Sequence, residues 1–179
     1  MKIDVAKAGE GMKQDYRSFL ASKMVIAKKT GITVDAGEIS NVLKPHQRDA
    51  VQWAAAGGRR AIFAAFGLGK TIMQLEWCRL IHEHKGGKML IVCPLGVKQE
   101  FMRDAVTLLH MDAPVYVRNM EEVTAAPGWL MITNYERVRD GDIRPDAFAG
   151  TSLDEAAVLR SFGSKTYQTF LSKFRGVPY

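Results

Sequence analysis

The chain has 179 residues, of which 25 are Lys or Arg and 19 are Asp or Glu, so its formal net charge is +6 and its pI is near 9.4. Hydrophobic residues make up 47% and charged residues 25%, a mixture typical of globular domains that excludes disordered, collagenous and low-complexity chains. The apolar runs, such as 89–92, are far shorter than the ~20 residues of a membrane span, so no membrane partner is expected.

An N-terminal extension, residues 1–38, is predicted to precede the main domain, residues 39–179. Apolar side chains recur at near-helical spacing over 15–29, and Gly31 closes the run. We therefore expect an amphipathic helix in the extension.

The expected compartment is the reducing cytoplasm, which is the host cytoplasm if the chain is encoded by a phage. The N-terminus carries charges where a secretion signal needs an apolar segment. Cys78 and Cys93 lie inside apolar patterns, so they are predicted to be buried thiols rather than disulfide partners or metal ligands.

From residue 43 onward, short apolar runs alternate with helical patterns, which predicts an α/β fold with a mostly parallel sheet and helices on both faces. The predicted strands are 61–65, 88–93, 115–118 and 129–133, with a weak fifth strand at 152–153. The predicted helices are 45–56, 70–84, 97–109 and 164–174. Trp53 and Trp77 lie on apolar helix faces and are predicted to be core residues.

A glycine-rich loop follows the first predicted strand and opens the next predicted helix. Residues 64–71 read Ala-Ala-Phe-Gly-Leu-Gly-Lys-Thr, a phosphate-loop pattern in which alanine replaces the first glycine. Gly67 and Gly69 would let backbone N–H groups surround phosphate oxygens, and the helix N-terminus adds its positive dipole. Lys70 would reach the β- and γ-phosphates, and the Thr71 hydroxyl would ligate Mg²⁺. A glycine turn with an incidental Lys-Thr is the alternative.

A pair of carboxylates, Asp154 and Glu155, follows the weak predicted strand. Hydrolysis of a nucleotide needs one carboxylate that holds the metal and one base that orients the attacking water. We interpret Asp154 as the metal residue and Glu155 as the catalytic base, with Lys70 as the other catalytic residue. An exposed acidic pair at a helix start, where the helix dipole favours negative charge, is the alternative.

Five segments, in this order, resemble motifs of the superfamily 2 helicases and translocases, in particular the Swi/Snf-like branch and phage-borne DEAD/DEAH-box helicases. The segments are 43–47 (LKPHQ), 64–71 (AAFGLGKT), 90–97 (LIVCPLGV), 132–136 (ITNYE) and 154–157 (DEAA). The resemblance implies a RecA-like P-loop NTPase domain with its ATP site at the carboxyl ends of parallel strands.

The resemblance also implies which residues bind each ligand. The Gln47 amide would read the adenine edge of ATP, and the segment around Pro94 would lie on a nucleic-acid backbone. The implied nucleotide-binding residues are Gln47, Phe66, Gly67, Leu68, Gly69, Lys70 and Thr71. The candidate nucleic-acid contacts are Pro94, Lys98, Thr133, Asn134 and Arg137, which would bind DNA without sequence specificity.

Two departures from the family pattern bear on activity. Ala157 stands where the family usually has a hydrogen-bonding residue that links the nucleotide to the nucleic-acid motifs. The family also closes ATP between two RecA-like domains, whereas the sequence stops at Tyr179, where the next strand with motif III is expected. We therefore expect the chain to be an N-terminal half that hydrolyses ATP slowly without the second RecA-like domain.

The function expected from these features is Mg-ATP hydrolysis coupled to movement on DNA or to its remodelling. One alternative is a catalytically inert DNA- or protein-binding remnant of such a helicase. A small-molecule kinase is a second alternative, and it would need an acceptor pocket after the acidic pair.

Overall fold

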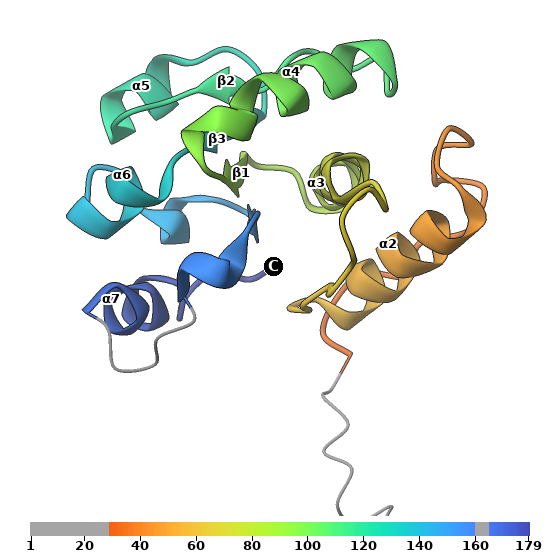
Figure 1. The fold of residues 1–179 in the computed structure, drawn as a ribbon, viewed down its shortest axis with the longest axis horizontal. Helices are drawn as coiled ribbons and strands as arrows, with labels where there is room; N and C mark the ends of the chain where they lie inside the picture. The colour runs from red at the N-terminus through yellow and green to blue at the C-terminus, as the bar shows by residue number, and fades with distance from the viewer. Residues whose placement is uncertain (1–28, 160–164) are drawn as a thin grey trace, which may run out of the picture.

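The computed structural model describes residues 29–159 and 165–179 (Figure 1). Four strands form one parallel sheet in the order β2-β3-β1-β4. They are β1 Met89–Val92, β2 Val115–Tyr116, β3 Leu130–Thr133 and β4 Gly150–Leu153. The predicted α/β class with a parallel sheet is confirmed. The helix predicted over 15–29 lies outside the described residues, apart from Lys29.

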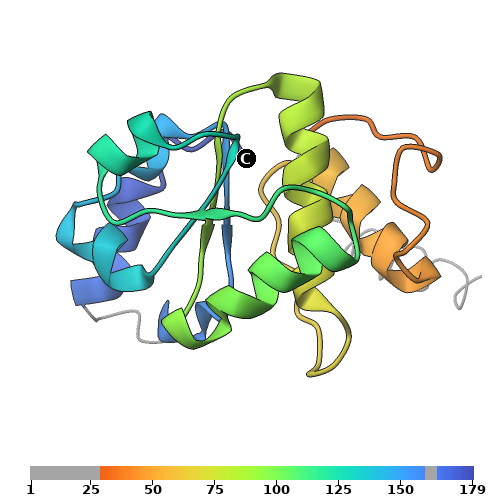
Figure 2. The same ribbon diagram turned by 90° about the horizontal axis from the view of Figure 1, so that it is seen from above.

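Helices cover both faces of the sheet, as predicted. They are α2 Pro45–Gly57, α3 Lys70–Lys85, α4 Lys98–Thr107, α5 Met120–Ala125, α6 Tyr135–Asp140 and α7 Lys165–Lys173. Short 3₁₀ turns occupy Leu95–Val97, Pro145–Ala147 and Ala156–Leu159. Figure 2 shows α3 and α4 on one face, with α2 outside α3, and α5, α6 and α7 on the other. No helix among the described residues combines the length and apolar character that crossing a membrane requires.

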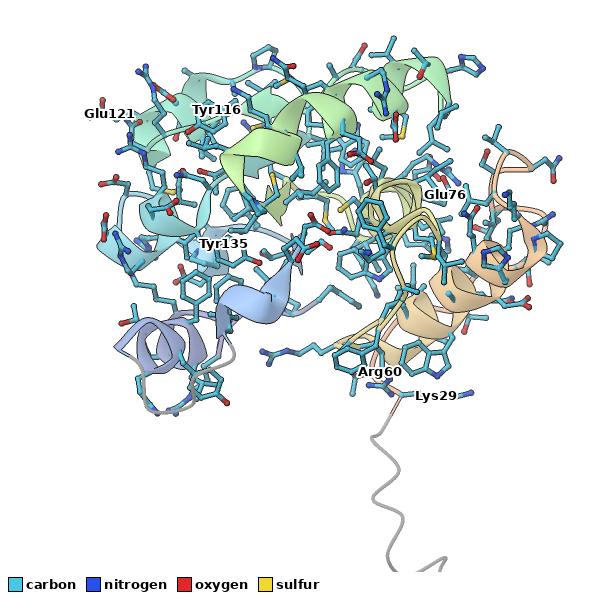
Figure 3. All side chains as sticks on the ribbon, in the orientation of Figure 1. Lys29, Arg60, Glu76, Tyr116, Glu121 and Tyr135 are labelled. Carbon is cyan, nitrogen blue, oxygen red and sulfur yellow. The ribbon has the colours of Figure 1, made fainter. Side chains whose placement is uncertain are left out.

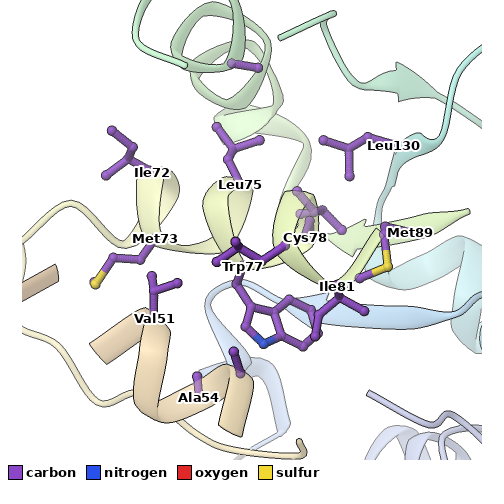
Figure 4. Close-up of a cluster of buried hydrophobic side chains, with 14 of the residues drawn as sticks. Val51, Ala54, Ile72, Met73, Leu75, Trp77, Cys78, Ile81, Met89 and Leu130 are labelled. Atoms are coloured by element: carbon purple, nitrogen blue, oxygen red, sulfur yellow. The ribbon is translucent and has the colours of Figure 1, made fainter. Parts of the chain in front are cut away.

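The strand side chains divide between two hydrophobic cores because successive residues point to opposite faces. Met89 and Ile91 of β1 pack with α2, α3 and α4, and Figure 4 shows the part of this core around α3. Leu90 and Val92 pack on the other side, with residues such as Phe170 of α7. All four residues of β1 are fully buried, which is the pattern of a central parallel strand.

The strand predicted over 61–65 does not form. A strand needs a neighbour to satisfy its backbone N–H and C=O groups. This segment is instead separated from β4 by a cavity of about 780 Å³, which Ile62, Phe63 and Leu153 help to line. Phe63 is 98% exposed, so an apolar sequence alone did not bring the segment into the sheet.

Three of the four residues predicted to be buried are buried, and one is not. Trp77 is buried, and so are the free thiols of Cys78 and Cys93. Burial raises the pKa of the Cys93 thiol to about 12, so the thiol is unreactive at neutral pH. Trp53 is 52% exposed instead of buried, and the Arg60 guanidinium lies 5.7 Å from its ring centroid. Trp53 therefore makes a cation–π contact at the surface and does not pack in the core.

The segment before α2 contributes to the same core as α2 and α3. Ile32, Val34 and Ile39 are buried there, and the Ile32 N–H donates to the Ala55 carbonyl at 2.9 Å. The domain boundary at residue 38 stays a prediction.

A buried carboxylate joins α3 to this segment. Glu76 is fully buried, and its Oε1 accepts hydrogen bonds from the Ser40 N–H and from Arg79 Nη2, each at 2.7 Å (Figure 3). Arg79 also donates from Nε to Glu76 Oε2 and from Nη2 to the Glu38 carbonyl, at 3.0 and 2.6 Å. The charge of Glu76 is therefore fully paired inside the fold, as burial of a carboxylate requires.

We expect Glu76→Gln to lower the free energy of unfolding by about 2 kcal/mol, because it removes the buried counter-ion of the partly buried Arg79. Glu83→Gln is the matched control, since Glu83 binds the same guanidinium but is half exposed, and it should cost about 0.5 kcal/mol. Urea denaturation of both variants measures the difference. Equal losses would show that burial of Glu76 contributes nothing beyond the ion pair.

Candidate nucleotide site and nucleic-acid edge

The glycine-rich loop, residues 64–71, leads into α3 at the edge of the sheet where the strands end (Figure 2). Gly67 and Gly69 have φ angles of +79° and +76°, and Gly69 is the N-cap of α3. These left-handed conformations favour glycine, so the loop needs both residues to turn into the helix. The free N–H groups of the first turn of α3 and its dipole make this end suitable for an anion.

Lys70 lies at the start of α3 and turns back toward the loop. Its Nζ donates to the carbonyls of Ala64 and Ala65 at 3.4 and 3.5 Å. The ring of Phe66, which is 98% exposed, has its centroid 5.9 Å from the same Nζ. Leu68 is also exposed, so the apolar side chains of the loop face solvent while its lysine contacts the backbone.

Gln47 of α2 contacts the loop directly. The buried amide donates from Nε2 to the Leu68 carbonyl at 2.9 Å and accepts the Lys44 N–H on Oε1 at 2.8 Å. A Cβ added at Gly69 would lie 2.4 Å from Gln47 Nε2. The structure thus brings Gln47 and the glycine-rich loop together through a hydrogen bond that the sequence did not predict, and the adenine contact expected of Gln47 stays a prediction.

The acidic pair follows β4 and faces α3. Asp154 is buried, and its Oδ1 accepts a hydrogen bond from Gln74 Nε2 at 2.8 Å. Gln74 in turn accepts the Ser152 hydroxyl on Oε1 at 2.7 Å, and the Tyr135 hydroxyl donates to the Asp154 carbonyl. Glu155 is exposed with a φ of +53°, an uncommon backbone for a non-glycine residue that concentrates at functional sites.

The surroundings of Asp154 make its charged form costly. Burial raises the pKa of its carboxyl, and the nearby charges of Glu155 and Glu100 raise it further. The Gln74 hydrogen bond and the Lys70 ammonium act in the opposite direction. A cation placed beside Asp154 would relieve this imbalance, since it would favour the ionised carboxylate.

Thr71 is held by a residue that the sequence did not suggest. Its Oγ1 donates to Glu100 Oε1 of α4 at 3.0 Å. Oxygen ligands of this kind suit Mg²⁺, which takes one or two protein ligands and completes its shell with water and phosphate. Within the described residues, no three His, Cys, Asp or Glu side chains gather closely enough to hold a metal by themselves.

The candidate nucleic-acid residues lie where β1, β2 and β3 end. Pro94 begins the turn before α4, and Lys98 Nζ lies 4.4 Å from the ring centroid of Tyr116 at the end of β2 (Figure 3). The Tyr116 hydroxyl donates to Asn134 Oδ1 at 3.5 Å, and Asn134 Nδ2 donates to Glu136 at 2.6 Å. The residues therefore form one edge that carries both cationic and aromatic groups.

Three of these candidates are already engaged within the fold, and one of them is Asn134, which is only 6% exposed and bound to Tyr116 and Glu136. Thr133 is 1% exposed, and its hydroxyl donates to the Val117 carbonyl at 2.7 Å, so it supports β3 from inside. Arg137 pairs with Asp142 at 2.9 Å but remains partly exposed. A phosphate could exchange with that surface pair at little cost, whereas the Thr133 hydroxyl lies out of reach of solvent.

Three residues of the site were missed by sequence reasoning. Gln74 lies three residues after Thr71 on the same helix, so its helical spacing from the phosphate loop was an available signal. Tyr135 lies inside the quoted segment 132–136 but had no role assigned. Glu100 gave no signal, because its contact with Thr71 spans 29 residues of sequence.

Comparison with solved structures identifies the fold. T4 UvsW has a TM-score of 0.63 and 17% identity, over 75% of this chain and 28% of that chain. A second structure, the UvsW helicase from bacteriophage T4, has a TM-score of 0.64 and 15% sequence identity, and the match covers 93% of this chain and 57% of that chain. The Sulfolobus solfataricus SWI2/SNF2 ATPase core in complex with double-stranded DNA has a TM-score of 0.60 and 17% sequence identity. The match covers 77% of this chain and 31% of that chain.

The chain has a RecA-like helicase fold. The sequence identities are low, so the similarity establishes the fold alone, and the sequence resemblance to Swi/Snf-like helicases agrees with it at that level. This chain covers only 28% to 57% of the length of the three solved chains. No protein-family model and no curated protein matches its sequence.

Substitution of the loop glycines tests the Gln47 contact. Gly67→Ala and Gly69→Ala both place alanine in a left-handed conformation, which costs about 1–2 kcal/mol. Nothing lies within 4 Å of a Cβ at Gly67, whereas at Gly69 the Gln47 amide must move and release Leu68. We expect Gly69→Ala to lower the free energy of unfolding by about 1 kcal/mol more, measured by urea denaturation. Equal losses would mean that the amide contact is energetically neutral.

Proposed function

We propose that this chain is the ATP-binding half of a DNA-dependent ATPase, a helicase or translocase that couples Mg-ATP hydrolysis to movement on DNA or to its remodelling. The proposal rests on one observation. The loop that carries Lys70 and Thr71 and the pair Asp154-Glu155, far apart in sequence, meet at one edge of the sheet through Gln74. This contact supports a site in which the proposed phosphate-binding residues, the proposed metal ligands and the proposed general base lie together.

Each residue has a role that follows from its position. The N–H groups at the start of α3 and the Lys70 ammonium would bind the phosphates, once Lys70 exchanges the weak contacts with Ala64 and Ala65 for phosphate oxygens. Gln47 lies against the loop, where its amide would contact the adenine edge. Glu155 is the exposed carboxylate of the pair, so it would orient the attacking water.

The residues present fit Mg²⁺. Thr71 and Asp154 offer oxygen ligands, and the raised pKa of Asp154 reflects a buried carboxylate whose charge a cation would favour. Bound Mg²⁺ would neutralise charge that develops on the phosphates during hydrolysis. What the chain itself supplies is the orientation of both ligands, through Gln74 for Asp154 and Glu100 for Thr71.

DNA is the proposed polymer partner, bound through its backbone without sequence specificity. Lys98, Asn134 and Arg137 lie along the edge formed by the ends of β1 and β3, beside the nucleotide site. One of the similar structures is an ATPase core in complex with double-stranded DNA, which supports this assignment. A second RecA-like domain is the proposed protein partner.

A catalytically inert remnant that binds DNA or protein is the second candidate. The observation that favours it is Ala157, a side chain without hydrogen-bonding groups at the family's linking position after the acidic pair. The two candidates differ in whether nucleotide binding depends on Lys70.

Lys70→Ala should abolish the binding of a fluorescent ATP analogue in Mg²⁺, because it removes the cation that contacts the phosphates. Glu155→Gln should preserve binding while slow, DNA-stimulated hydrolysis falls by at least about 100-fold, the usual contribution of a general base. Fluorescence titration and phosphate release in the same samples measure both quantities.

Lys85→Ala is the matched control, since Lys85 is the last residue of α3 and is exposed. It should behave as the unchanged chain does. If Lys70→Ala binds the analogue as well as Lys85→Ala does, the phosphate loop is not in use and the inert remnant is the better description. Full DNA-stimulated activity in Glu155→Gln would remove that residue from the catalytic role.

Lys98→Ala should weaken the binding of duplex DNA equally for unrelated sequences, because a backbone contact carries no sequence information. The slope of log affinity against log salt should fall by about 1, the value for one lost phosphate contact. Fluorescence anisotropy at several salt concentrations measures the slope, with Lys85→Ala as the equal-charge control. A salt slope that matches the control would place the DNA elsewhere.

A further inference from the structure

Glu100, in the first turn of α4, contacts the phosphate loop. Glu100 Oε1 accepts the hydrogen bond from Thr71 Oγ1 at 3.0 Å. Glu100 belongs to the helix that follows β1, and Thr71 is the second residue of α3. A side chain outside the loop and outside the acidic pair therefore holds the hydroxyl to which the proposed function assigns Mg²⁺.

The direction of this hydrogen bond matters for metal binding. A hydroxyl has one proton to donate and two lone pairs to offer. When its proton goes to Glu100, the oxygen of Thr71 keeps its lone pairs available for a cation. Hydrogen bonds from an outer shell orient metal ligands in this way and raise their basicity.

The neighbouring charged groups have partners of their own. Asp154 Oδ1 is bound by Gln74, and the Arg103 guanidinium, one turn after Glu100, is bidentate on Asp104 Oδ1 at 2.9 and 2.7 Å. The Glu100 carboxylate is thus directed to Thr71 rather than to the arginine of its own helix. A carboxylate in the first turn of a helix is also favoured by the dipole, but that effect does not select a partner.

We infer that Glu100 is a positioning residue for the Mg-nucleotide complex, which it holds by orienting the Thr71 hydroxyl and by adding negative charge beside the phosphate loop. The inference rests on the proposed function. It assigns to α4 a part in nucleotide binding, in addition to the nucleic-acid contact proposed for Lys98 in the same turn.

The test is the dependence of nucleotide affinity on Mg²⁺, measured with a fluorescent ATP analogue in excess Mg²⁺ and in EDTA. Glu100→Gln should weaken affinity in Mg²⁺ roughly tenfold, the usual effect of losing an outer-shell partner. Affinity in EDTA should stay the same or rise, because the change removes a negative charge near the phosphates. Asp112→Asn, in the exposed loop after α4, is the matched control and should change neither value.

A double-mutant cycle tests whether Glu100 acts through the Thr71 hydroxyl. The Mg²⁺-dependent gain is the increase in nucleotide affinity in Mg²⁺ over the affinity in EDTA. In a Thr71→Val background, Glu100→Gln should have no further effect on this gain, since the hydroxyl through which Glu100 acts is gone. A full additional loss in that background would overturn the inference, because Glu100 would then act independently of Thr71. Thermal denaturation of each variant shows that it is folded.

The remaining outcomes separate this inference from the proposed function. If Lys70→Ala abolishes binding but Glu100→Gln keeps the whole Mg²⁺-dependent gain, the inference is wrong and the proposed function stands. If affinity falls equally in Mg²⁺ and EDTA, Glu100 supports the loop alone and the inference is also wrong. If the unchanged chain binds no nucleotide, both fail.

Discussion

The hydrogen bonds of Gln74 hold α3, and with it the glycine-rich loop, against the end of β4. In this chain the segment before the loop, residues 61–65, is not paired with the sheet, so no strand fixes the loop from that side. The amide of Gln74 bridges Ser152 and Asp154, and the buried face of α3 packs on β1. The relative position of the two halves of the candidate site therefore depends on one side chain and one helix interface.

The same edge of the sheet brings two kinds of candidate ligand site into contact. The first turn of α4 carries Lys98, which lies over Tyr116, and Glu100, which holds Thr71. A turn of helix is a rigid unit, so a displacement that moves one of these side chains also moves the other. The first turn of α4 therefore joins the candidate nucleic-acid edge to the glycine-rich loop within one rigid element.

Sequence patterns predicted the elements whose chemistry is local. Helix α2 begins at Pro45 and ends before Gly58, whose φ is +77°, because proline suits a first helical turn and glycine suits its end. The prediction for 61–65 was wrong because hydropathy reports that residues are apolar and says nothing of whether a strand lies beside them. The roles of Glu100 and Gln74 could not be derived, because each contact joins positions whose distance in space only the fold determines.

The outer side of β4 is an open edge of the sheet. Among the described residues β4 is the last strand of the sheet, and beyond the bond from the Thr151 N–H to the Tyr179 carbonyl it borders the cavity. Phe63 and Phe66, on the loop segment beside it, are each 98% exposed. An open strand edge next to exposed aromatic rings is a template for pairing between molecules. The edge of β4 turned away from β1 is therefore a part of the described fold where a further strand could add.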